Sequence, residues 1–212
     1  MKYIAAASLV VLCTLAGQAN AQQPQRGWYA GASAGQSSAD VSSNGLVVIG
    51  ATASTVTVED TDTGYKAYGG YRFGRHLAVE AGYVDLGSFG ATRHVTSPGI
   101  GSLKAETSVS GIFGQAVGII PLGERFSLFA TGGLFANEVK TTLSSTGGVV
   151  LVGQRSESHS DVNAKLGVGA GFDFTPNFGV RVEWERFFQV GDDSVGGKSD
   201  LDLLSIGIVV RF

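Results

Sequence analysis

The run ESHSD, residues 157–161, brings Ser158, His159, Ser160 and Asp161 together. Serine, histidine and aspartate are the nucleophile, general base and orienting acid of enzymes that hydrolyse acyl bonds. Adjacent residues of a strand point to opposite faces, however, so a serine beside a histidine does not readily hydrogen-bond to it there. We therefore interpret the run as a solvated loop end, and we predict that the protein is not an enzyme.

The other two histidines offer no further site. His76 lies beside a predicted turn and His94 lies in a predicted loop, each without a partner at a fixed spacing. The single cysteine, Cys13, lies in a segment that we expect to be removed. Zinc sites need histidine and cysteine ligands at short, regular spacings. We predict no metal site and no cofactor.

A second chemical feature is a set of charged residues that alternate with apolar ones. In Val162–Phe174, apolar side chains occupy every second position, while Lys165 and Asp173 fall between them. Single buried charges cost much free energy, so these must be paired. The sequence predicts a lumen ion-pair network with these members: Lys66, Arg72, Glu80, Lys165, Asp173, Arg181, Glu183, Glu185 and Arg211. We interpret it as a plug, and a gated, narrow ion-conducting path through the same residues is the alternative.

Eight segments must position these side chains, and each alternates with a period of two rather than 3.6. The segments are 27–37, 64–74, 76–87, 106–120, 124–137, 160–174, 178–189 and 201–212. They are longer than typical soluble strands and long enough to cross a bilayer at a tilt. Their apolar faces carry aromatic residues near the ends, as in transmembrane barrels. We predict an all-β fold, an eight-stranded antiparallel up-and-down transmembrane β-barrel; the faces of residues 106–120 stay unassigned.

The connections between these segments alternate between two kinds. Three are tight turns, at Gly74-Arg75, Pro121–Gly123 and Thr175–Asn177. Four are long: 38–63, 88–105, 138–159 and 190–200. Short turns on one side and long loops on the other are typical of outer-membrane barrels, with the short side in the periplasm. The β-branched runs in Gly45–Asp60 and Gly148–Ser158 are expected to extend the barrel wall as a rim.

The two ends of the chain carry export and assembly features. Residues 1–21 combine Lys2, an apolar run and the sequence Ala19-Asn20-Ala21, which predicts a cleaved signal peptide. We expect residues 22–212 to form one barrel domain. The last ten residues place apolar side chains at every second position, and we predict that these residues form an assembly signal: Leu204, Ile206, Ile208, Val210 and Phe212.

The composition limits the partners. The chain has 15 basic and 18 acidic residues, and removing Lys2 with the signal peptide leaves 14 basic residues and a net charge of −4. Such a mild balance without a basic patch argues against nucleic acid. We expect outer-membrane lipid as surroundings, the barrel assembly machinery as a partner during insertion, and a monomeric barrel.

Five stretches resemble a known family. They are GWYAGASAG (Gly27–Gly35), GGYRF (Gly69–Phe73), LAVEAGYVDLG (Leu77–Gly87), FTPNFGVRVEWERF (Phe174–Phe187) and LLSIGIVVRF (Leu203–Phe212). In this order they are similar to the small outer-membrane β-barrel family that includes the membrane domain of outer membrane protein A and the porin-like or opacity-type barrels. The resemblance implies a barrel in the outer membrane of a Gram-negative bacterium. It also places lumen ion pairs at Glu80, Arg181 and Glu183, whereas Ser33 and Thr131 stand where the family has basic residues.

Function is expected to lie in the envelope or at the cell surface. The resemblance implies roles in envelope integrity, in host or surface contact, or in leakage of small solutes. Long loops are where such proteins carry function. We predict a structural or adhesin-like role through loops that contact a surface or host ligand. A low-conductance porin is the alternative, and a lipid-modifying outer-membrane enzyme is a weaker one.

Overall fold

The computed structural model describes residues 26–39, 53–97, 101–147, 156–192 and 197–212. The predicted signal peptide, residues 1–21, lies outside the described residues. Within the described ranges, no helix has the length and apolarity needed to cross a bilayer.

The described residues form nine strands. Their bounds are β1 (Gly27–Ala39), β2 (Ala53–Glu59), β3 (Thr61–Arg72), β4 (Leu77–Ser97), β5 (Gly101–Pro121), β6 (Phe126–Gly147), β7 (Ser156–Asp173), β8 (Phe178–Asp192) and β9 (Gly197–Arg211).

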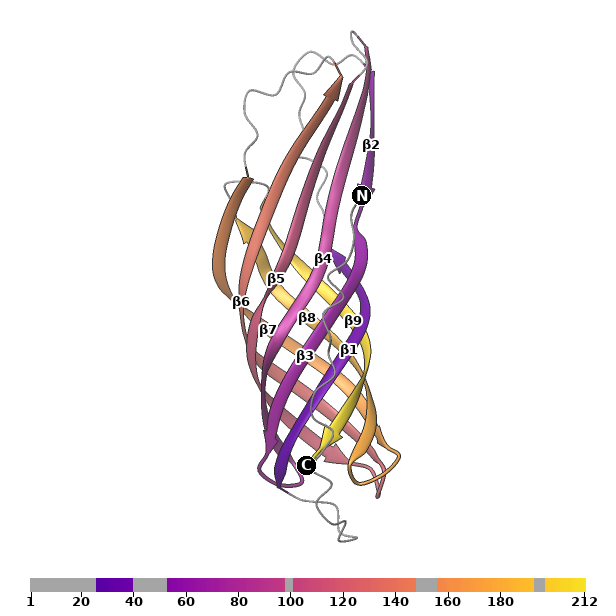
Figure 1. Cartoon of the computed structure of the whole chain (residues 1–212), viewed down its shortest axis with the longest axis vertical. Coiled ribbons are helices and arrows are strands. Elements are labelled where there is room, and N and C mark those ends of the chain that lie inside the picture. Colours follow the sequence, from indigo (N-terminus) through magenta and orange to yellow (C-terminus); the bar gives the residue numbers. More distant parts are fainter. Residues whose placement is uncertain (1–25, 40–52, 98–100, 148–155, 193–196) are drawn as a thin grey trace, which may run out of the picture.

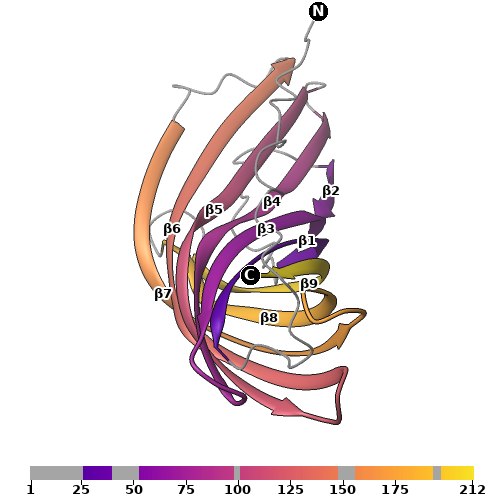
Figure 2. The same ribbon diagram turned by 60° about the horizontal axis from the view of Figure 1, so that its bottom comes forward.

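Eight of these strands close into a barrel. The order β4-β3-β1-β9-β8-β7-β6-β5 is completed by pairing between β4 and β5, and every pair is antiparallel. The first and last strands meet in register, with Ala32 opposite Ile208. Figures 1 and 2 show the tilted strands wrapped into a cylinder. Closure leaves no unpaired edge in the wall, and the predicted eight-stranded antiparallel barrel is confirmed.

The alternation along each strand separates two surfaces. In β7, Val162, Leu166 and Val168 point outward and are exposed, whereas Asn163 and Lys165 point into the lumen and are buried. An exposed apolar band around a closed barrel is what a lipid environment requires. The same alternation settles the segment that the sequence left unassigned. In β5, Phe113, Gln115 and Val117 face the lumen, and Ile112 and Ile120 face outward.

The two ends of the barrel differ strongly. The three tight turns lie where they were predicted, at residues 73–76, 122–125 and 174–177. The prediction that residues 88–105 and 138–159 are loops is wrong: β4 continues to Ser97, β5 begins at Gly101, and β6 continues to Gly147. Backbone pairing does not stop at the edge of the lipid, because residues up to Val95 of β4 still find partners on β5.

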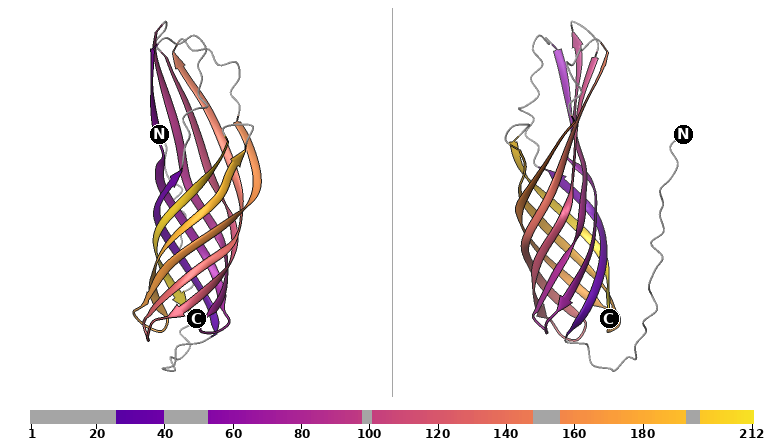
Figure 3. Two further views of the ribbon diagram at one scale, coloured as in Figure 1. Left: turned by 180° about the vertical axis from the view of Figure 1, so that it is seen from behind. Right: turned by 60° about the vertical axis from the view of Figure 1, so that its left-hand side comes forward.

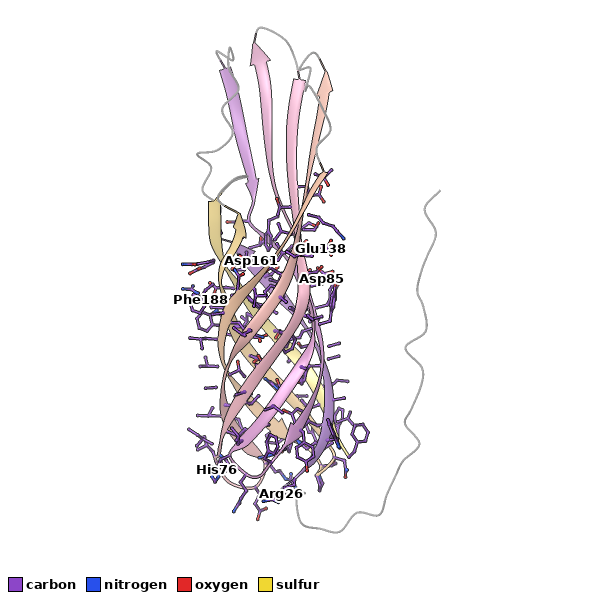
Figure 4. All side chains as sticks on the ribbon, turned by 90° about the vertical axis from the view of Figure 1, so that its left-hand side faces the viewer. Arg26, His76, Asp85, Glu138, Asp161 and Phe188 are labelled. Carbon is purple, nitrogen blue, oxygen red and sulfur yellow. The ribbon has the colours of Figure 1, made fainter. Side chains whose placement is uncertain are left out.

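Beyond the barrel, β4, β5 and β6 continue as an open sheet, which we call the extension (Figures 1 and 3). β2 joins it by pairing with β4, from Glu59 opposite Gly90 to Ala53 opposite Ser97. This strand lies within Gly45–Asp60, so part of the expected rim is present. Residues 45–52 and 148–155 of the two predicted rim segments lie outside the described residues, and residues 156–158 belong to β7. Figure 4 places Asp85, Glu138 and Asp161 near the level where the extension begins, and Arg26 and His76 at the turn end.

A β-bulge marks the transition from barrel to extension. The β4–β5 register shifts between Asp85 and Ser88, and Gly87 adopts a φ of 82°. The Ser88 backbone N–H donates to a carboxylate oxygen of Asp62 at 2.6 Å, and the Ser37 hydroxyl donates to the Leu86 carbonyl at 2.5 Å. Bulges bend a strand and re-aim its side chains. This one lets β4 leave the cylinder while both flanking strands stay attached to it.

Candidate functional site: the barrel lumen

Alternation on four strands gathers the predicted charged residues in the lumen. Lys66 comes from β3, Glu80 from β4, Lys165 from β7, and three further residues from β8. Lys165 and Glu185 have no exposed surface, and Arg181 is 8% exposed. Their neighbours Tyr65 and Trp184 point outward. The period of two thus separates lipid-facing from lumen-facing chemistry.

Six of the nine predicted residues form what we call the lumen ion-pair chain. Its members alternate in charge in the order Glu80, Arg181, Glu183, Lys66, Glu185, Lys165. The five N–O links measure 2.5, 3.0, 2.5, 2.5 and 2.5 Å in that order. Three cations and three anions cancel, so the chain is neutral as a whole. Removing water from so many charges is costly, and only such mutual pairing offsets that cost.

Glu80 is the most fully satisfied member of the chain. One carboxylate oxygen accepts from the Tyr29 hydroxyl at 2.7 Å and from Arg181 Nη1 at 2.5 Å. The other accepts from the Gln115 amide at 2.6 Å and from Arg181 Nη2 at 3.4 Å. Four hydrogen bonds from three residues, on β1, β5 and β8, hold this carboxylate. Sequence reasoning missed Tyr29 and Gln115, because uncharged lumen residues do not stand out from their neighbours.

Aromatic rings enclose the two ends of the chain. The Lys165 ammonium lies 4.1 Å from the ring centre of Phe113 and 4.9 Å from that of Phe187. The Arg181 guanidinium lies 4.1 Å from the ring centre of Phe129. A cation over an aromatic face is attracted to it, more strongly when water is excluded. The rings therefore stabilise Lys165, the last member of the chain, and Arg181, its second member, and they fill the lumen around both.

Toward the extension, the lumen is apolar rather than charged. The apolar layer consists of buried residues that belong to one hydrophobic cluster: Val84, Leu86, Phe89, Val109, Phe135, Phe187, Val190, Leu201 and Leu203. Phe135 and Phe187 pack edge to face with ring centres 4.9 Å apart. On β8, Phe187 and Val190 follow directly after the charged residues. An eight-stranded barrel is just wide enough for its own side chains to fill. Here the filling side chains are mainly apolar, together with the buried, uncharged Ser37, Asn137 and Asn163.

The three remaining predicted residues lie at the turn end, apart from the chain. Arg211 pairs with Asp173 at 2.7 Å. Arg72 joins no ion pair among the described residues; its Nε and Nη2 donate to the carbonyls of Gly74 and Arg75 at 2.9 and 3.1 Å. The structure therefore divides the single predicted network into three parts. These are the chain of six, the separate Arg211–Asp173 pair, and Arg72, which hydrogen-bonds to the β3–β4 turn.

Lumen glycines make room for the rings that cross the barrel. A Cβ atom at Gly169 would collide with the ring of Phe129 and with the Val182 carbonyl. Gly169→Val is therefore expected to lower the free energy of unfolding by about 1–3 kcal/mol through overpacking, measured as the urea midpoint of the folded barrel. Gly114→Val is the matched control, because nothing lies within 4 Å of its Cβ position on the outer face. Equal effects of the two substitutions would contradict the proposed packing.

The predicted assembly-signal residues lie on the outer face of β9 and just beyond it. Leu204, Ile206, Ile208 and Phe212 are exposed there, and Val210 is half-buried. The Phe212 backbone N–H donates to the Trp28 carbonyl at 3.0 Å, which ties it to β1. Their role in assembly stays a prediction.

The histidines do not gather into a site. His76 is exposed at the turn end, His94 lies opposite Thr55 in β4, and His159 lies opposite Val139 in β7. The interpretation of residues 157–161 as a loop end is wrong, since they pair with β6. Within the part of the chain that the structure describes, no group of three metal-ligating side chains exists.

A closed antiparallel barrel with an exposed apolar belt defines the class of outer-membrane β-barrel proteins. The chain belongs to the family described as the OmpA-like transmembrane domain, whose model matches residues 23–212. The protein is accordingly located in the outer membrane of a Gram-negative bacterium. In this class the short turns face the periplasm, so the extension faces outward from the cell.

Individual relatives agree with this assignment. The chain is 26% identical to outer membrane protein A of Yersinia pseudotuberculosis over 214 residues and 27% identical to that of Serratia marcescens over 217 residues. It is matched over its whole length but spans only 56% of the length of each of these relatives. Neisserial surface protein A is similar in fold, with a TM-score of 0.51 and 13% identity over 87% of this chain and 97% of that one.

Proposed function

We propose that the protein is a surface-interaction protein in which a sealed, monomeric barrel anchors the extension outside the outer membrane. The observation that carries this proposal is the length of β4, β5 and β6, which have 21, 21 and 22 residues. A tilted strand needs about 9–11 residues to cross the hydrocarbon core. Roughly half of each of these strands is therefore available outside the lipid.

The extension offers a defined place for a partner. β2 stands at the end of the sheet order, so one of its sides has no strand partner among the described residues. An exposed strand edge readily pairs with a strand of another molecule. A surface or host ligand that adds a strand to β2 is the interaction that fits this geometry. Nucleic acid does not fit it, because the sequence of β2, ASTVTVE, contains no basic residue.

The alternative functions have less support. A low-conductance pore would need a water path through the lumen, whereas the apolar layer fills the outer half. A lipid-modifying enzyme would need a serine, a histidine and an acid in contact. Ser158, His159 and Ser160 are consecutive residues of β7, and consecutive positions of a strand do not share a face of the sheet.

A shortened hairpin tests the proposal. The variant replaces residues 92–104 by an Asn-Gly turn, which joins the paired residues Ala91 and Ala105. The barrel is expected to fold with an unchanged melting temperature, because the β4–β5 pairs below the bulge remain. Adherence of cells that display the variant to immobilised matrix proteins and glycans should fall at least tenfold relative to cells that display the unshortened chain.

A periplasmic change serves as the control. Leu122→Ser alters an exposed residue of the β5–β6 turn and leaves the extension intact, so adherence should be unchanged at equal display. Unchanged adherence of the shortened variant, with the barrel folded and displayed, would rule out the extension as the interaction surface.

A further inference from the structure

The periplasmic half of the lumen contains a cavity that the ion-pair chain does not explain. Its volume is about 60 Å³, and its polar lining comes chiefly from Tyr29, Arg72, Glu80, Arg181 and Arg211. A cavity needs roughly 10–15 Å³ to hold one water molecule. The space is thus large enough for a polyatomic ion together with water.

The charges around this cavity do not balance. Glu80 is already shared with Arg181, and Arg211 is paired with Asp173. The lumen ion-pair chain is neutral, so Arg72 leaves the described lumen with one uncompensated positive charge. Placing a cation close to two other arginines without an anion is costly.

Two residues that line the same space have unused donors. Arg72 donates two of its side-chain N–H groups to turn carbonyls. A guanidinium has five such groups, so three remain available. The Nε of Arg181 is buried without a hydrogen-bond partner in the structure. Both oxygens of Glu80 are occupied by donors, so its carboxylate offers little competition. Arginine donors in a fixed planar arrangement match the oxygen atoms of tetrahedral oxyanions.

We propose that this cavity is a binding site for a small inorganic oxyanion of the phosphate class, held by Arg72, Arg181 and Arg211 at the periplasmic end of the lumen. The anion balances the charge of Arg72 and accepts the unused N–H groups. Arg211 and Arg72 are both half-buried, so the site is reached from the periplasm without opening the lumen ion-pair chain or the apolar layer.

Calorimetric titration of the refolded chain with inorganic phosphate, at constant ionic strength, tests the proposal. The expected result is saturable binding of one phosphate per barrel. Arg72→Gln should weaken binding at least tenfold. Arg75→Gln is the matched control, because it removes the same charge from an exposed side chain of the neighbouring turn, and it should bind as the unchanged chain does.

A second variant separates loss of the site from loss of the fold. Gly171 lines the cavity, and its Cβ position meets only the Ser127 hydroxyl at 3.1 Å and the Val180 carbonyl at 3.7 Å. Gly171→Val therefore fills part of the cavity and keeps every arginine. A barrel of this variant that stays folded but loses phosphate binding supports the site. Undiminished binding in Gly171→Val, equal binding in the two arginine variants, or no saturable binding by the unchanged chain would overturn the proposal.

Discussion

The variant Arg181→Met is expected to lose about 3–5 kcal/mol of unfolding free energy, because removing one partner of a buried ion pair leaves the others uncompensated. Arg181 lies between Glu80 and Glu183 at 2.5 and 3.0 Å. Without it, two carboxylates in a water-poor lumen share only the donors of uncharged side chains and Lys66. Urea titration of the barrel folded in lipid vesicles measures the loss.

The same strand supplies the control. Arg186 pairs with Asp202 at 2.7 Å, but this pair lies on the outer face and its side chains are 37% and 26% exposed. Partly exposed pairs contribute roughly 0–1 kcal/mol, so Arg186→Met should have a small effect. The double variant Arg181→Met, Glu80→Gln should recover part of the loss, since it removes the carboxylate that loses most. A loss below about 1 kcal/mol for Arg181→Met would show that the chain is not a buried, mutually dependent set.

The sequence was sufficient to predict that the six charged side chains of the lumen ion-pair chain face inward. A period of two needs no knowledge of neighbouring strands, so Lys165 and Glu183 could be assigned to the inner face from their own segments alone. Their partners could not be assigned in this way. Lys66 and Glu183 are 117 residues apart in the chain and lie on strands that are not adjacent in the sheet. Such contacts across the lumen depend on the tilt and stagger of the closed barrel.

The apolar layer shows a different limit. Leu203 and Phe187 face inward by the same alternation that placed the charged residues. The predicted lumen set nevertheless contains only charged residues and omits both of these apolar ones. A signal was present: Leu203-Leu204 and Phe187-Phe188 are apolar on both faces, which indicates a strand between lipid and a dry interior. The predicted strands were also too short at the outer ends of β4, β5 and β6. Bilayer thickness sets a minimum length for a membrane strand and sets no maximum, as β4 to β6 demonstrate.

The order of layers along the lumen determines what it can conduct. Charged groups can exchange partners and admit water, whereas an apolar constriction excludes water and ions. We therefore expect the unchanged chain to be silent in a planar bilayer. Glu80→Gln alone should also be silent, although it removes the first charge of the ion-pair chain, because Phe135 and its neighbours still fill the outer half.

Opening the lumen should require changes in both layers. Phe135 is fully buried against Phe187, and Phe135→Ala removes a ring from the centre of the apolar layer. Combined with Glu80→Gln, it is expected to give discrete single-channel openings, while Glu80→Gln with Phe126→Ala stays silent. Phe126 belongs to the same strand but is 42% exposed on the outer face. Openings in the unchanged chain, or in Glu80→Gln alone, would mean that the charges form the gate of a working pore, and solute passage would then replace surface interaction as the function of this barrel.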